Sequence, residues 1–477
     1  MGVEVAKPLE LRRRPGKPQP QVEVAKPALS FTSNALLGMG LWVLLWSGYN
    51  TDLERFLRPE FPTDTLDFIH GLRAFGPILA GWIACLVIFV RAKRLFPWII
   101  GPVGLLFFYA ATGLVSSATL SVEPAGALYF GFNYLAIVLV MLAIALVDDP
   151  LPDLLKVLRL TWFVAIALTL GLLGAIPILG SDVIIQTEAS PVGIRAYTGV
   201  GSVMGMTSTR NTGFARYAAV SALAALPTVM NKENRLVVRI FWGVMLAASF
   251  YALILANGRT ETAAFIAGLF VFLIAEKARR LLYSLAAAAA AIVLGFEGFY
   301  SKFYLYFTRS GHFDLTFTRR TDIWQEGWQL FWKSPWVGFG FQADRYFMEG
   351  LHMHNAFLHA LVQSGFLGGV AIFIGLAVVW YYTIYYFFLH QPADKSLIPP
   401  EIPAILLFTT VSSITESTFA YYSAAWLLCA PIVVYVMSLH ARMRKVSLKA
   451  TQDRQQKLRL AKRKPRVVLP PFETPPA

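Results

Sequence analysis

Apolar runs of about twenty residues recur along most of the chain and are separated by short polar segments. A run of that length forms a helix that crosses a hydrocarbon core of roughly 30 Å. We therefore expect an all-α polytopic integral membrane protein with about twelve transmembrane helices. The expected spans are 31–49, 74–90, 97–117, 126–147, 158–180, 211–229, 236–256, 261–275, 281–299, 355–389, 401–418 and 419–438.

The charged residues between the spans predict an orientation. Lys and Arg gather in alternate connections, at 91–94, 231–235, 276–280 and 441–445. By the positive-inside rule these connections are cytoplasmic, and both termini lie on the same side. The other connections, including the large loop 300–354, face the opposite side, where polar chemistry has room.

Composition supports a membrane domain between two polar tails. The chain is 56% hydrophobic and 15% charged, which is too apolar for an ordinary soluble protein. Residues 1–28 and 446–477 lack an apolar stripe, so we expect disordered basic cytoplasmic tails around a transmembrane domain at 29–445. The net charge of +14 fits anionic lipid headgroups, and no recognition fold accompanies it that would indicate nucleic-acid binding.

Several arginines fall on the predicted external side, against the usual charge bias. A short turn between two spans holds Arg259 close to the hydrocarbon boundary, where a guanidinium suits a phosphate or diphosphate group. Any one of these arginines could instead be a lipid anchor. The set comprises Arg210, Arg216, Arg259, Arg319 and Arg320.

Three of the seven histidines, His352, His354 and His359, gather where the tenth span begins. On a continuous helix the first and last would lie roughly 10 Å apart along the axis, too far to share one ion. No acidic cluster accompanies them in the sequence, and we expect no metal site and no cofactor. Asn355 follows His354 and could orient substrate or cap the helix.

The large loop contains its own pattern. Between 317 and 332, aromatic and polar residues alternate at the spacing of an amphipathic helix, which Pro335 and two glycines then end. Such a helix could lie packed in the membrane interface, or it could cover a lateral opening for a lipid-linked substrate. The pattern does not separate the two.

Five features together resemble the O-antigen ligase and polymerase superfamily, most specifically over 257–369. They are the "GR" turn at 258–259, Arg320 four residues before Trp324, "SPWVGFG" at 334–340, "HN" at 354–355, and the glycines of 365–369. The double arginine at 319–320 leaves the register open by one residue, and the spacing to Trp324 favours Arg320.

This resemblance implies a metal-independent, inverting glycosyltransferase with a membrane fold of the glycosyltransferase C type. It would act on the periplasmic side of a Gram-negative inner membrane. It would transfer O-antigen polysaccharide from undecaprenyl diphosphate to lipid A–core oligosaccharide. By the family pattern, Arg259 and Arg320 would bind the diphosphate, and His354 would activate the acceptor hydroxyl.

Other activities stay open at the level of sequence. Within the superfamily, an O-antigen polymerase and a protein-directed oligosaccharyltransferase compete with the ligase. A transporter of lipid-linked glycans is the alternative from another class. It is disfavoured because Asp, Glu and Arg are concentrated at helix ends and in loops rather than near mid-span.

Overall fold

The computed structural model describes most of the membrane domain and part of the C-terminal tail. The described ranges are 32–48, 72–92, 95–179, 185–186, 209–256, 258–277, 320–348 and 352–463, together with 281, 284 and 285. The expected N-terminal tail, most of the span expected at 281–299 and the first twenty residues of the large loop lie outside the described residues.

The described residues form an almost entirely helical protein. The elements are α1 (Ser33–Ser47), α4 (Gly76–Val90), α5 (Phe96–Ile99), α6 (Pro102–Thr119), α7 (Pro124–Ala145), α8 (Leu151–Leu179), β1 (Ile185–Gln186), β2 (Thr209–Arg210), α11 (Asn211–Met230), α12 (Leu236–Ala256), α13 (Arg259–Ala275), α16 (Arg320–Lys333), α17 (Ala343–Phe347), α18 (Ala356–Ile384), η3 (Tyr385–Leu389), η4 (Lys395–Leu397), α19 (Glu401–Ser412) and α20 (Ala424–Arg463). The two strands are two residues each and pair in parallel.

Local sequence explains several helix starts. Thr32 caps α1 by accepting a hydrogen bond from the Ala35 amide at 3.0 Å. Proline occupies the first residue of α6 and of α7, where its missing N–H would have no partner within the helix. These starts fall within a few residues of the predicted boundaries.

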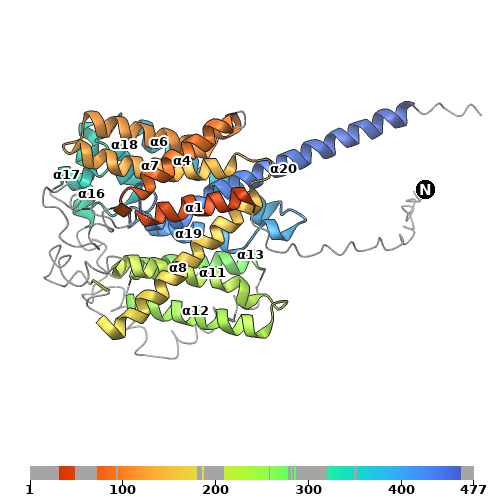
Figure 1. The fold of residues 1–477 in the computed structure, drawn as a ribbon, viewed down its shortest axis with the longest axis horizontal. Helices are drawn as coiled ribbons and strands as arrows, with labels where there is room; N and C mark the ends of the chain where they lie inside the picture. The colour runs from red at the N-terminus through yellow and green to blue at the C-terminus, as the bar shows by residue number, and fades with distance from the viewer. Residues whose placement is uncertain are drawn as a thin grey trace, which may run out of the picture.

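The helices pack as one bundle (Figure 1). α4, α6, α7 and α18 lie along one side of the view, α11, α12 and α13 along the other, and α1 and α19 between them. α16 and α17 lie at one end of the bundle, and α20 projects from the opposite end. The end that carries α16 and α17 also carries the polar residues described below.

Seven described helices are long and apolar enough to cross a membrane, and α1 and α4 are apolar but shorter. The structure therefore agrees with a polytopic membrane protein, while the count of about twelve spans stays a prediction. The spans expected at 401–418 and 419–438 are corrected, because α19 ends at Ser412 and α20 begins only at Ala424. The intervening loop carries polar residues that the sequence analysis had placed inside helices.

At the C-terminus, α20 continues to Arg463. The helix therefore extends well past 446, where the sequence analysis expected a disordered tail to begin. In Figure 1 this part of α20 extends away from the bundle.

The expected span 355–389 is interrupted at Gly365, whose φ of 61° lies in the left-handed region. The loop that follows α16 fits against this break. Phe339 and Gly340 donate backbone hydrogen bonds to the carbonyls of Val362 and Gln363, each at 2.8 Å, and Phe366 donates to Pro335 at 2.7 Å. Backbone groups at the kink thus gain partners from the loop.

The amphipathic helix expected at 317–332 is present as α16, which ends at Lys333, two residues before Pro335. Leu330 and Phe331 are buried against α18, while Trp328 and Trp332 are exposed. This exposed aromatic face fits a helix that lies at a membrane interface.

Candidate active site

A buried carboxylate, Glu416, lies at the centre of the candidate site. It belongs to the loop between α19 and α20, and its side chain is 6% exposed. Three basic groups from three other segments converge on its two oxygens. The Arg216 Nη2 lies 2.8 Å and the His354 Nδ1 3.2 Å from Oε2, and the Arg320 Nη2 lies 3.3 Å from Oε1.

Burial raises the pKa of the Glu416 carboxyl, but Arg216, His354 and Arg320 outweigh burial. The pKa of Glu416 therefore lies well below the usual range of a glutamate, so Glu416 is ionised at neutral pH. An anion fixed in this position holds the three basic groups together.

A second buried carboxylate extends the network. Glu261, in the first turn of α13, is 1% exposed, and its Oε1 lies 3.4 Å from the Arg216 Nε. The Arg216 guanidinium therefore lies between two carboxylates, and it is still 14% exposed.

The backbone around His354 is unusual and firmly held. His354 has φ of 49°, a left-handed conformation that is uncommon for a residue with a side chain. Asn355 caps α18 by accepting from the Leu358 amide at 2.9 Å, and its Nδ2 donates to the Ile414 carbonyl at 3.1 Å. Of the two roles open for Asn355, the structure shows the helix cap.

Arg320 and Trp324 connect α16 to the same site. The Arg320 Nη1 donates to the Thr415 carbonyl at 2.6 Å, so this guanidinium contacts both backbone and side chain of the Glu416 loop. One turn later, the Trp324 Nε1 donates to the Met353 carbonyl at 2.7 Å. The four-residue spacing thus brings both side chains to the segment around His354.

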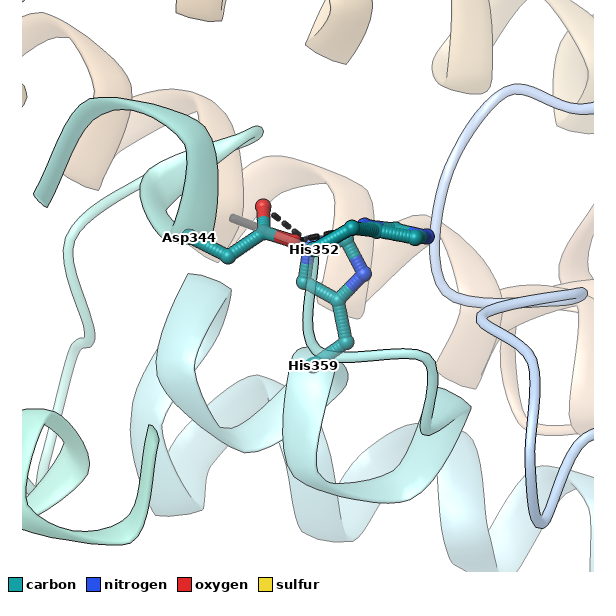
Figure 2. A group of neighbouring side chains, drawn as sticks. All are labelled: Asp344, His352 and His359. Carbon is teal, nitrogen blue, oxygen red and sulfur yellow. Dashed lines mark hydrogen bonds and ion pairs between the residues drawn. The ribbon is translucent and has the colours of Figure 1, made fainter. Parts of the chain in front are cut away.

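Asp344 also contacts that segment, through His352 and Met353 (Figure 2). Its fully buried carboxylate accepts from the His352 Nδ1 at 2.7 Å and the Met353 amide at 3.2 Å through Oδ2. The His359 Nε2 lies 3.0 Å from Oδ1. Asp344 therefore fixes both residues that directly precede His354.

Charge in this cluster follows from its burial. Burial lowers the pKa of His352 to about 3, although Asp344 opposes that shift. Burial also raises the pKa of Asp344, but the neighbouring His359 and His352 lower it by more than burial raises it. The pKa of Asp344 therefore lies well below the usual range of an aspartate. The cluster at neutral pH is therefore an aspartate anion that accepts from a neutral His352.

The structure corrects the argument that the histidines lie too far apart to share an ion. α18 begins only at Ala356, so His352 precedes the helix and folds back. One ligand atom from each of Asp344, His352 and His359 lies within 4.8 Å of the others. In this spacing the three groups could hold a cation, and in the structure they hydrogen-bond to one another.

The comparisons with known proteins agree with the resemblance. Residues 244–373 match a family model described as O-antigen ligase. This segment carries the O-antigen ligase family pattern. Over 84 residues the chain is 32% identical to the exopolysaccharide production protein ExoQ of Rhizobium meliloti (strain 1021), covering 14% of this chain and 19% of that protein. The family resemblance drawn over 257–369 is confirmed.

The segment that matches the O-antigen ligase family contains most of the site. Arg259, Glu261, Arg320, Asp344 and the three histidines lie within it, and Arg216 and Glu416 lie outside it. The structure therefore joins the family segment to two parts of the chain, α11 and the loop before α20, that the match does not cover.

For the other arginines predicted to bind diphosphate, the structure gives the backbone position of Arg259 and Arg210 but not that of Arg319. Arg259 is the first residue of α13, two positions before Glu261. Arg210 lies on β2 directly before α11, and the position of its side chain is not described. Arg319 lies outside the described residues.

Sequence reasoning missed Glu261, Asp344 and Glu416. Glu261 and Glu416 were hidden within predicted spans, and Asp344 lies eight residues before His352 in a loop whose path the sequence does not show. One signal was available for Glu261, since a carboxylate two residues after an arginine at a membrane helix start needs a partner when buried.

Proposed function

We propose that the protein is an O-antigen ligase. It transfers O-antigen polysaccharide from undecaprenyl diphosphate to lipid A–core oligosaccharide in the inner membrane, with the site facing the periplasm. The family match, the relative and the long apolar helices support the broader part of this proposal, a multi-pass membrane protein of the O-antigen ligase and polymerase type, which acts in polysaccharide biosynthesis.

One observation carries the proposal, the convergence of Arg216, Arg320 and His354 on Glu416. Each of the three basic side chains is partly exposed, at 14%, 17% and 21%. Their exposed atoms can therefore contact a substrate, while the more deeply buried Glu416 fixes their positions. Two guanidinium groups offer planar, paired donors suited to a diphosphate.

The proposed roles follow from these contacts. Glu416 contacts the His354 Nδ1, which leaves Nε2 as the atom that accepts the proton of the acceptor hydroxyl. The hydroxyl oxygen bonds to the anomeric carbon from the face opposite the leaving group, and configuration inverts. The bond from that carbon to the phosphate oxygen breaks, and undecaprenyl diphosphate leaves with the electron pair.

The arginines then stabilise charge that develops on the leaving diphosphate. Fixed donors around a developing anion commonly contribute the largest part of such catalysis. Because the network already contains two carboxylates, an incoming diphosphate competes with Glu416 and Glu261 for Arg216 and Arg320. Arg259, and Arg210 from its place before α11, are proposed to add positive charge at the same face. In this mechanism the chemistry needs no divalent ion.

A second candidate is an exopolysaccharide or O-antigen polymerase, which joins carrier-linked repeats to one another. The name of the relative in Rhizobium meliloti favours it, since that protein is named for exopolysaccharide production. Both reactions use the same donor chemistry and differ in the acceptor.

Product analysis separates the two. Purified protein receives undecaprenyl-diphosphate-linked O-antigen with and without lipid A–core. A ligase yields high-molecular-weight product only when lipid A–core is present. Longer carrier-linked chains in both reactions would establish the polymerase instead.

A further inference from the structure

A cavity of about 270 Å³ lies directly beside the Glu416 network. It is bounded by α7, the start of α11 and the loop that leads into α20. Arg216 and Tyr421 belong to its wall. Because Arg216 also contacts Glu416 and Glu261, a molecule in this cavity lies next to the groups proposed for catalysis.

Asn133 of α7 is the feature that indicates a ligand. The residue is fully buried, it lines the cavity, and both its amide nitrogen and its amide oxygen are without a hydrogen-bond partner within the part of the chain that the structure describes. Buried amides nearly always have partners, so an exception needs an explanation. A primary amide presents donors and an acceptor side by side, which complements groups that both donate and accept.

Aromatic rings form much of the remaining wall. The Tyr129 hydroxyl donates to the Ala74 carbonyl at 3.1 Å, which fixes that ring. Tyr421 packs against His352 and His359 with ring centroids 5.8 and 5.6 Å away. Tyr421 thus connects the cavity to the cluster that holds the His354 segment.

The residues that line the cavity fit one part of a lipid-linked glycan, the sugar, better than the polyprenyl chain or the diphosphate. A polyprenyl chain would leave the Asn133 amide unpaired. A diphosphate could bind Arg216 but has no hydrogen-bond donor for the amide oxygen of Asn133. A sugar ring has apolar faces for the aromatic walls and hydroxyl groups, each a donor and an acceptor, for the amide. Walls that combine aromatic rings with a few placed polar groups are typical of sites for small molecules.

We propose that this cavity binds one sugar ring, with the Asn133 amide paired to its hydroxyl groups. The proposal rests on the proposed function, since it places a saccharide beside the reacting centre. The ring belongs either to the donor glycan or to the acceptor oligosaccharide, and the experiment distinguishes the two sources.

The decisive variant is Asn133→Leu, which keeps nearly the same side-chain size and removes the amide. Since the wild-type amide lacks a partner among the described residues, the variant is expected to unfold at the same temperature or higher. Its affinity for the saccharide falls by about tenfold or more, because a leucine cannot pair hydroxyl groups. A merely structural asparagine would show the opposite pattern, with lost stability and unchanged affinity.

Binding is measured directly with two probes, free O-antigen oligosaccharide and delipidated core oligosaccharide, on wild type and variant in nanodiscs. Thr161→Val is the matched control, because the Thr161 hydroxyl is buried on α8 and donates to the Val157 carbonyl of the same helix at 2.9 Å. Loss confined to the first probe assigns the ring to the donor, and loss confined to the second assigns it to the acceptor.

Equal affinities of wild type and Asn133→Leu for both probes would overturn the proposal. Turnover is measured in the same preparations. If the variant loses affinity while wild type shows no glycan transfer, the sugar site stands and the proposed function fails. If wild type transfers glycan and the variant matches it in KM for both substrates and in affinity for both probes, the proposed function stands and the sugar site fails.

Discussion

At the residue scale, the Arg320 guanidinium contacts two partners at once through two nitrogens, which the single ammonium group of a lysine cannot do in the same geometry. Its Nη1 donates to the Thr415 carbonyl and its Nη2 lies near Glu416. Arg320→Lys is therefore expected to reduce kcat/KM by about 10- to 100-fold, although the positive charge is kept. Arg442→Lys is the matched control, since Arg442 on α20 pairs with the exposed Asp149 and does not belong to the Glu416 network. Equal losses in both variants would reduce Arg320 to a lipid anchor.

His352 gives the protein a dependence of stability on pH. Its pKa is about 3 in the folded protein and about 6.5 in the unfolded chain, so between these values the unfolded chain binds the extra proton. Stability then falls as the pH falls below 6.5, by up to about 1.4 kcal/mol for each unit.

The His352→Gln variant keeps a side-chain N–H for Asp344 and does not titrate. Its thermal unfolding in detergent should therefore vary less between pH 7 and pH 4 than that of wild type. The low pKa of Asp344 acts in the same direction but mainly below the usual range of an aspartate, outside most of this window. Identical slopes in both proteins would contradict the assignment of a neutral buried His352.

Sequence alone identified His354, Arg216 and Arg320 as candidates, but not the carboxylate that joins them. Residue type and predicted membrane side were enough to collect the cations. Glu416 could not be assigned because its role depends on a loop that the hydropathy pattern placed inside a span. Likewise, the proximity of His352 to His359 depends on where α18 starts, and helix boundaries are the least certain part of a sequence-based prediction.

At the scale of elements, the contact between the loop 334–340 and the break in α18 holds one wall of the site. A Cβ on Gly365 would lie 2.2 Å from the carbonyl carbon of Trp336, and the residue has a left-handed φ. Gly365→Ala is therefore expected to lower both the unfolding temperature and the rate of transfer. For a chain of 477 residues the unfolding temperature falls by about 1–2 °C for each kcal/mol lost.

Gly171→Ala in α8 is the matched control for that substitution. Nothing lies within 4 Å of a Cβ built on Gly171, so alanine there should be neutral or stabilise α8 by about 0.5–1 kcal/mol. Unchanged stability in Gly365→Ala would show that the loop and α18 do not depend on this close approach. The apolar runs predicted α18 as one span because a glycine alone does not reveal a break.

At the scale of the whole molecule, the polar network lies where segments distant in sequence meet. Arg216 comes from α11, Arg320 from α16, His354 from the start of α18 and Glu416 from the loop before α20. Hydropathy predicted the membrane class, and loop charges predicted an orientation that stays a prediction. Neither pattern contains the packing of helices against one another, which decides the members of the site.

The same assembly bears on metal dependence. The Asp344, His352 and His359 cluster has the donors to hold a cation, yet its members already pair with one another. Excess chelator is therefore expected to leave the rate of transfer within about twofold of the untreated protein, as charge stabilisation comes from the arginines. Inhibition that added divalent ion reverses would instead make this cluster a functional metal site.

The central claim is that His354, held by Glu416, accepts the proton of the acceptor hydroxyl. The most direct test is the rate of glycan transfer from undecaprenyl-diphosphate-linked O-antigen to lipid A–core by purified wild type, His354→Ala and Glu416→Gln. His354→Ala should bind donor as wild type does within a few fold, and both variants should lose about 10²- to 10⁴-fold in rate, as expected for loss of a general base or its anchor. Transfer by His354→Ala at the wild-type rate would contradict the account.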